Sequence, residues 1–193
     1  MEYTWEILGK TITVETDPSL FSPKAPDQGT LHMLSHVELT PDDRVLDLGC
    51  GTGVVGIWAA LQVGGDHVVM TDVDPKAVSI SKKNLHNNGI QGATVVLGPD
   101  VSAVPGKGFT WILSNPPYHT DFKVAKAFIE KGFNRLEIGG RMVLVTKRKE
   151  WYKNKMISIF GGVKIYEEEG YFVFISTKKS ENYAKKIRQK FEK

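Results

Sequence analysis

The sequence predicts an α/β protein with a doubly wound, mostly parallel sheet. One observation predicts this class, and a second predicts that it forms a single domain. Apolar strands alternate along the chain with amphipathic helices, which indicates a parallel sheet covered on both faces. The length of 193 residues, 41% of them hydrophobic, is enough for one domain with a sizeable core. We expect a single domain over residues 1–193, with a hairpin extension at residues 1–20 and a basic tail at residues 179–193.

The N-terminal segment precedes this alternation. Two stretches of alternating apolar and polar residues, 3–8 and 10–16, flank Gly9 and predict a short hairpin. Residues 17–29 are rich in Pro, Asp and Ser and predict a loop. Residues 30–39 have the apolar spacing of a helix.

From residue 44 onward, strands and helices alternate. The strands are predicted at residues 44–49, 67–72, 93–98, 109–115 and 139–147. The helices are predicted at residues 54–63, 75–88, 121–136 and 149–160. Residues 163–169 and 171–178 predict a closing hairpin through Gly170, which adds at least one antiparallel strand at an edge of the sheet.

Composition excludes several classes of protein. No apolar run approaches the roughly 20 residues that a membrane-spanning helix needs. The first residues lack the basic and apolar regions of a secretory signal, so a cytoplasmic protein is expected. Cys50 is the one cysteine in the sequence, which excludes an intrachain disulfide and a multi-cysteine metal site. The histidines are scattered, so no metal site is expected.

Charge is distributed unevenly. Residues 1–146 hold 12 Lys and Arg against 16 Asp and Glu, whereas residues 147–193 hold 13 against 6. Each basic cluster, such as "TKRKEWYKNK" or "STKKS", fits a solvated surface. Together the clusters favour a polyanionic partner, because phosphate binding is largely electrostatic.

The first strand runs into the glycine-rich stretch "VLDLGCGTGVVG". Gly49, Gly51 and Gly53 lie between a strand and a helix, where the backbone can approach a ligand closely and helix N–H groups point outward. Gly51, Gly53 and Gly56 also match the dinucleotide pattern G-x-G-x-x-G, a weak signal on its own. Asp47 lies two residues before the first glycine and would repel a pyrophosphate. It favours a cationic ligand, such as an ammonium or a sulfonium.

Acidic residues follow the next two strands. Asp72 ends a strand about one β-α unit later, where a carboxylate can accept both hydroxyls of a ribose. Asp74 opens the next helix and is predicted to cap it. Asp100 follows the third strand and either accepts a hydrogen bond from an adenine amino group or belongs to an ordinary turn. Ligands of such sheets bind beyond the carboxyl ends of the strands, so these residues are expected at one site.

The fourth strand ends in "SNPPYH". An amino group conjugated to an aromatic ring is a poor nucleophile, because its lone pair is delocalised. If the Asn115 side-chain oxygen and the Pro116 carbonyl each accept one of its protons, the nitrogen becomes more pyramidal and can aim its lone pair at a methyl on sulfur. Pro116 and Pro117 hold these acceptors stiffly, and Tyr118 offers a face on which a planar base can stack. We therefore predict catalysis at this turn.

"VLDLGCGTG", "TDVDP" and "NPPY", in this order and spacing, resemble the motifs of class I S-adenosylmethionine-dependent methyltransferases. The resemblance covers the chain from about Phe21 to Thr177. Within the class, the chain is similar to the small-domain methyltransferases, typified by the bacterial small-subunit ribosomal RNA guanine-N2 enzymes. Three pairs match this narrower pattern: Phe21-Ser22, Gly29-Thr30 and Tyr118-His119.

The resemblance implies a Rossmann-like sheet of seven strands with an antiparallel last strand, and S-adenosyl-L-methionine as cofactor. It implies cofactor contacts for the methionine end at Asp47, Gly49, Gly51 and Gly53, for the ribose at Asp72, and for the adenine at Asp100 and Val73. Val73 could equally belong to the core. The implied catalytic residues are Asn115, Pro116, Pro117 and Tyr118.

The implied reaction is methyl transfer to an exocyclic amino nitrogen of a nucleobase in RNA, namely guanine N2 of small-subunit ribosomal RNA. Lys147, Arg148 and Lys149 follow the fifth strand and either clamp RNA phosphates or form a solvated turn. His119 either lines the base pocket or caps the next helix. The guanine-N2 enzymes pair this domain with an inactive second copy, which we do not find in the sequence, so which RNA is bound stays open.

Other functions share parts of this pattern. Adenine N6 in RNA or DNA, a protein glutamine amide or a small metabolite could replace guanine as the acceptor. The glutamine enzymes usually carry a helical recognition domain ahead of the motif. A non-catalytic RNA-binding module descended from such an enzyme is a further alternative, although the intact glycine stretch, Asp72 and Asn115 speak against it.

Overall fold

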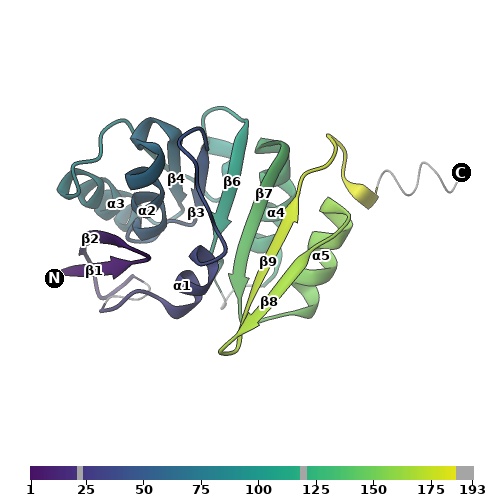
Figure 1. Ribbon diagram of the computed structural model, residues 1–193, viewed down its shortest axis with the longest axis horizontal. Coiled ribbons are helices and arrows are strands. Elements are labelled where there is room, and N and C mark those ends of the chain that lie inside the picture. Colours follow the sequence, from purple (N-terminus) through teal and green to yellow (C-terminus); the bar gives the residue numbers. More distant parts are fainter. Residues whose placement is uncertain (21–23, 118–120, 186–193) are drawn as a thin grey trace, which may run out of the picture.

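A seven-stranded sheet organises the computed structural model, which describes residues 1–20, 24–117 and 121–185 (Figure 1). Its strands stand in the order β5-β4-β3-β6-β7-β9-β8. The parallel strands are β3 (Val45–Leu48), β4 (Val68–Asp72), β5 (Thr94–Leu97), β6 (Phe109–Ser114) and β7 (Leu136–Thr146). The hairpin of β8 (Lys164–Glu168) and β9 (Tyr171–Thr177) completes the sheet. The predicted doubly wound, mostly parallel sheet is confirmed.

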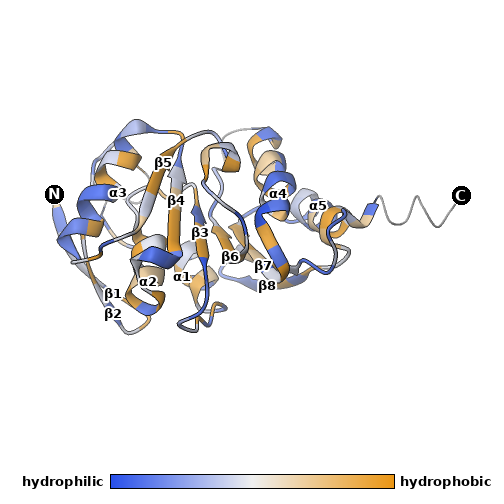
Figure 2. Cartoon of the chain, turned by 90° about the horizontal axis from the view of Figure 1, so that it is seen from above, coloured by the Kyte–Doolittle hydropathy of each residue, from blue (hydrophilic) through white to orange (hydrophobic). Residues whose placement is uncertain are grey.

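Helices cover both faces of this sheet (Figure 2). One face carries α1 (Gln28–Leu34), α2 (Val54–Val63) and α3 (Pro75–Asn87), and the other carries α4 (Lys123–Arg135) and α5 (Glu150–Phe160). Short 3-10 turns occur at η1 (Gly65–His67) and η2 (Val101–Ala103). Side chains of β6 alternate between the two cores: Trp111 and Leu113 face the first layer, whereas Ile112 faces the second.

The N-terminal hairpin, β1 (Glu2–Ile7) and β2 (Lys10–Glu15), packs on α2 and α3 rather than joining the large sheet. Two asparagines, Asn84 on α3 and Asn88 at its C-cap, bond the edge of β2 that faces away from β1. Asn88 accepts the Thr13 N–H at 2.9 Å and donates to the Thr13 carbonyl at 2.8 Å. Asn84 bonds both backbone groups of Glu15 in the same way, at 2.8 and 3.0 Å. The predicted hairpin is confirmed, and these bonds attach it to the domain.

Several elements differ from the predicted ones, and helix α1 also ends at Leu34 rather than at residue 39. Helix α1 begins at Gln28 inside the predicted loop, because Asp27 caps it by accepting the Thr30 N–H. Strand β7 begins at Leu136 rather than at residue 139, with an irregular register against β6. In the closing hairpin the antiparallel strand β9 lies inside the sheet, paired with β7, and β8 forms the edge. The expected antiparallel strand is therefore β9, next to the edge. The edge strand β8 pairs with β9 in antiparallel orientation.

The strand order reverses at β3, whose neighbours are β4 on one side and β6 on the other. The chain winds outward in both directions from this point, so the turns that follow β3 and β6 diverge and leave a crevice above their carboxyl ends. Ser114 bridges the two strands here, since its hydroxyl donates to the Leu48 carbonyl at 2.7 Å. None of the helices in the described ranges is long and apolar enough to cross a membrane.

Candidate active site

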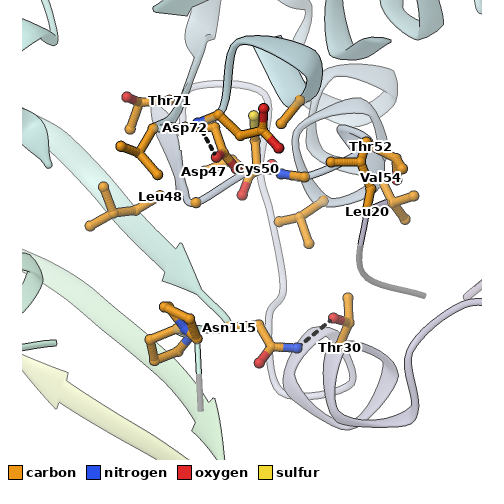
Figure 3. Close-up of a pocket in the computed structure, with 18 of the residues that line it drawn as sticks. Leu20, Thr30, Asp47, Leu48, Cys50, Thr52, Val54, Thr71, Asp72 and Asn115 are labelled. Atoms are coloured by element: carbon orange, nitrogen blue, oxygen red, sulfur yellow. Dashed lines mark hydrogen bonds between the residues drawn. The ribbon is translucent and has the colours of Figure 1, made fainter. Parts of the chain in front are cut away.

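A cavity of about 570 Å³ opens at the carboxyl ends of β3, β4 and β6 (Figure 3). The glycine turn and the acidic strand ends form one part of its wall, and the turn after β6 forms another. Most of the predicted site residues line it: Asp47, Gly49, Gly51, Asp72, Val73, Asp100, Asn115, Pro116 and Pro117. Parallel strands therefore bring together residues that lie far apart in the sequence.

The glycine turn after β3 is held by the end of β4. The N–H groups of Gly49 and Cys50 both donate to the Thr71 carbonyl at 2.9 Å. Gly49 and Gly51 have φ values of 80° and 55°, and no atom lies within 4 Å of a β-carbon added at Gly51. Glycine is needed for these angles, and it leaves the backbone open to a ligand. Gly53, by contrast, is the N-cap of α2 and does not line the cavity. A β-carbon added there would lie 3.0 Å from the side chains of Met70 and Ser81.

Asp47 is the buried acid of the site, with 3% of its surface exposed. Burial raises the pKa of its carboxyl to about 7; the hydrogen bond from the Gly56 N–H, at 2.9 Å, opposes this shift, and the nearby charge of Asp72 adds to it. An ionised carboxylate in such a place is stabilised by a cation. The prediction that Asp47 favours a cationic ligand is therefore consistent with its surroundings.

Asp72 ends β4 and organises the turn beside it. Its Oδ2 accepts the Gly51 N–H at 2.9 Å, and its Oδ1 accepts the Asp74 N–H at 3.0 Å. Val73 is largely exposed at the cavity wall, so the alternative of a core role does not describe it. Asp74 accepts the Lys76 N–H at 2.9 Å and caps α3, as predicted.

Asp100 lines the cavity and also has structural partners. Its Oδ1 accepts the Ser102 N–H at 2.8 Å, which caps η2, and its Oδ2 pairs with Lys131 Nζ at 2.8 Å. Desolvation would raise the pKa of this carboxyl, but the bonds from Lys131 and Ser102 outweigh it and hold the pKa below its usual value. The turn role is thus present, and the contact with adenine stays a prediction.

Asn115 follows β6 directly, with its side chain half-buried. Its Nδ2 donates to Asp27 Oδ2 at 2.8 Å. The same nitrogen donates to Thr30 Oγ1 at 3.2 Å (Figure 3). Pro116 is buried and Pro117 is exposed, and both line the cavity. Tyr118 and His119, predicted for base stacking and for the base pocket, lie outside the described residues.

Lys147, Arg148 and Lys149 follow β7 as an exposed group that does not line the cavity. Each cation lies over an aromatic ring, at 4.9 to 5.7 Å from the ring centroid. The rings are those of Tyr171, Phe122 and Phe172, respectively. Because cation–π contacts leave the outer side of the cation to solvent, the group remains able to meet phosphates. Its role in RNA binding stays a prediction.

Several residues of the cavity were not among the predicted site residues. Trp5 and Leu20 come from the N-terminal extension, and Phe128 comes from α4, where its ring lies 3.6 Å from a β-carbon added at Gly49. Asp27 and Thr30 come from the start of α1. Aspartate is a preferred N-cap residue, so Asp27 could have located this helix start, though not its contact with Asn115.

Cys50 also lines the cavity but is buried. Desolvation, and next the charge of Asp47, raise the pKa of its thiol well above the ordinary value. It is therefore a neutral packing residue of the turn, as predicted. Within the described ranges, no three His, Cys, Asp or Glu side chains are grouped so that they could hold a metal ion.

Comparison with known proteins identifies relatives that match most of the chain. The family model described as "Methyltransferase small domain" matches residues 11–176. "Ribosomal RNA small subunit methyltransferase C" of Pseudomonas entomophila is 33% identical over 166 residues, which cover 83% of this chain and 49% of that protein. The protein of the same name from Pseudomonas syringae pv. tomato is 32% identical over 182 residues, covering 92% and 54%.

A solved structure agrees with these relatives. The 16S rRNA N2 G1207 methyltransferase RsmC of T. thermophilus, in complex with AdoMet and guanosine, has a TM-score of 0.83 and 27% sequence identity. The match covers 93% of this chain and 50% of that one. The chain thus spans about half the length of the relatives it matches.

Proposed function

The chain belongs to the methyltransferase small domain family, and on this premise we propose that it is an S-adenosylmethionine-dependent RNA methyltransferase. The proposed acceptor is an exocyclic amino nitrogen of a base, namely guanine N2 of small-subunit ribosomal RNA. One observation carries the proposal: a single cavity joins the acidic ends of β3 and β4 to the asparagine–proline turn after β6. The relatives named as small-subunit ribosomal RNA methyltransferases support the choice of acceptor.

The residues of the cavity fit S-adenosylmethionine. The buried carboxylate of Asp47 would hold the cationic methionine end, beside the open backbone of Gly49 and Gly51. Asp72 would accept the ribose hydroxyls, and Asp100 with Val73 would border the adenine. When bound, the cofactor supplies a methyl group on a positively charged sulfur.

Asn115 and Pro116 would prepare the acceptor base. The Asn115 Oδ1 and the Pro116 carbonyl would each accept a hydrogen bond from one N–H of the amino group, which would draw the nitrogen lone pair out of conjugation. Pro116 and Pro117 fix the backbone φ angles at this turn, so the two acceptors keep their spacing without further ordering. Most of the rate enhancement then comes from placing the nitrogen and excluding water.

The basic group at Lys147, Arg148 and Lys149 supports a nucleic-acid substrate. These residues lie at the carboxyl end of β7, on the same edge of the sheet as the cavity. Three exposed cations would neutralise phosphates flanking the target nucleotide. A ribosomal RNA substrate would place the protein in the cytoplasm.

Labelled cofactor provides the test. The protein is incubated with S-adenosylmethionine labelled in the methyl group, and with 16S ribosomal RNA, assembled small subunits, DNA and protein in separate reactions. We expect label in RNA, recovered as N2-methylguanosine after nuclease digestion and mass spectrometry. Label recovered as N6-methyladenine, or only in DNA or protein, would overturn the proposed acceptor. The Asn115→Ala variant is the matched control for contaminating activity.

A further inference from the structure

We propose that Asp27, assisted by Thr30, is a positioning residue that fixes which end of the Asn115 amide accepts hydrogen bonds. The inference rests on the proposed function, because it assigns a role in presenting Asn115 to the acceptor base. Asp27 belongs to the segment before α1, 88 residues away from Asn115 in the sequence. Nothing in the asparagine–proline motif itself requires it.

The contacts join three side chains. Asn115 Nδ2 donates to Asp27 Oδ2 at 2.8 Å and to Thr30 Oγ1 at 3.2 Å. The same Oδ2 accepts the Thr30 N–H at 2.8 Å and the Thr30 hydroxyl at 3.2 Å. Figure 3 shows the amide nitrogen of Asn115 turned toward Thr30.

The chemistry of a carboxylate makes this group directional. An asparagine amide has a donor end and an acceptor end of nearly equal shape, so either end could face a neutral partner. An ionised carboxylate only accepts hydrogen bonds, so it holds the Nδ2 end and repels the Oδ1 end. Asp27 therefore makes Oδ1 the accepting end of the amide, on the side away from the carboxylate.

The anchor itself is held rigidly. Asp27 is the N-cap of α1, so its carboxylate is fixed by the helix that it begins, and Thr30 is buried. A β-carbon added at Gly29 would lie 2.7 Å from the Tyr171 ring and 3.0 Å from Asp27 Oδ2. Glycine at this position thus leaves room for the carboxylate between the helix and β9.

The variants that test the proposal separate orientation from helix capping. Asp27→Ser keeps a good N-cap but is too short to reach Asn115. Asp27→Asn keeps an oxygen that can accept from both Thr30 and Asn115. Asp43 provides the matched control, because it accepts the Thr40 N–H and hydroxyl at the same 2.8 and 3.2 Å as Asp27 does from Thr30. Asp43→Ser removes these local bonds without affecting the Asn115 amide.

We expect Asp27→Ser to lower kcat for RNA methylation by about 10- to 100-fold, and Thr30→Val by about two- to tenfold. The Kd for S-adenosylmethionine should stay unchanged, and the melting temperature of Asp27→Ser should fall no more than that of Asp43→Ser. Asp27→Asn should recover only part of the activity, because the Thr30 N–H still holds an acceptor oxygen in place but the charge that excludes the other orientation of the Asn115 amide is lost. The proposal is overturned if Asp27→Ser keeps full kcat, or if it loses kcat, cofactor binding and melting temperature together while Asp43→Ser loses none.

A second readout does not depend on methyl transfer. In ¹⁵N–¹H spectra, the Nδ2 signals of Asn115, assigned by their loss in Asn115→Ala, should move in Asp27→Ser and in Thr30→Val but not in Asp43→Ser. If the unchanged protein methylates no RNA, the proposed function fails, and these signals still decide whether Asp27 holds the amide. Signals that stay in place in both variants would overturn the positioning role.

Discussion

Asp47 Oδ2 accepts the backbone N–H of Gly56 at 2.9 Å, so the buried acid at the end of β3 reaches the first turn of α2. This bond and the positive end of the helix favour the ionised carboxylate. They do not compensate for its burial, because the pKa of Asp47 still rises to about 7. In the absence of a ligand, about half of the Asp47 carboxyls are thus ionised at pH 7, and this charge is lost progressively as the pH falls further.

The affinity for S-adenosylmethionine should therefore depend on pH through Asp47. A bound ammonium or sulfonium lowers the pKa of Asp47, so ligand binding must displace a proton below pH 7. We expect the association constant, measured by calorimetry, to fall by about tenfold for each pH unit below 7.

The Asp47→Asn variant is the control for this dependence. It keeps an acceptor for the Gly56 N–H but has no proton to lose, so it should bind more weakly at pH 7 and show little change between pH 5 and 7. An unchanged pH slope in the variant would mean that another group titrates.

Asn115→Ala should separate chemistry from cofactor binding. Both proposed acceptors of the amino protons are needed, so removing one should lower kcat by at least about 100-fold. The fold should persist, since Asp27 Oδ2 keeps both bonds from Thr30. Methyl transfer and calorimetry would be measured on the same preparation, with the exposed Asn182→Ala as control. Full transfer by Asn115→Ala would contradict the catalytic role.

Arg148→Ala should affect RNA binding rather than chemistry. The guanidinium lies 5.1 Å from the centroid of the Phe122 ring, where it is exposed to a phosphate. Losing one phosphate contact should raise the KM for RNA and reduce the slope of log KM against log salt by about one, with kcat unchanged. Lys82→Ala, on the exposed side of α3, is the matched loss of charge. If the unchanged protein, Arg148→Ala and Lys82→Ala all had the same salt slope, the proposed contact of Arg148 with an RNA phosphate would be contradicted.

The convergence of the site could be predicted from the sequence because it follows from topology. Asp47, Asp72 and Asn115 each end a parallel strand, and such ends meet at one edge of the sheet. The contact of Asp27 with Asn115 could not, because it depends on how a proline-rich loop enters α1. Local spacing gives no information about a partner 88 residues away.

The strand order of the closing hairpin also could not be predicted from the sequence. The sequence indicates two strands joined by a turn, but the order β7-β9-β8 depends on which strand pairs better with β7. Apolar residues on both faces of β9 suit the inner place, and the charged residues of β8 suit the edge. Lys178 was predicted to belong to a basic surface cluster, whereas its side chain is buried.

Lys178 should therefore be a stabilising residue and not part of an RNA surface. Its Nζ donates to the carbonyls of Phe133 and Leu136, both at 2.9 Å, and pairs with Glu181 at 3.3 Å. These carbonyls lie where α4 ends and β7 begins. Lys178→Met fills a similar volume but leaves them without their charged donor, so the free energy of unfolding should fall by about 2–3 kcal/mol.

The neighbouring Lys179 is exposed, and Lys179→Met should change the free energy of unfolding by less than about 0.5 kcal/mol. Urea denaturation of both variants measures the two effects. Because Lys178 is buried, its loss should leave the salt dependence of RNA binding unchanged, in contrast to Arg148→Ala. A Lys178→Met protein that is as stable as Lys179→Met, but binds RNA with a smaller salt slope, would show instead that Lys178 meets phosphate at the surface.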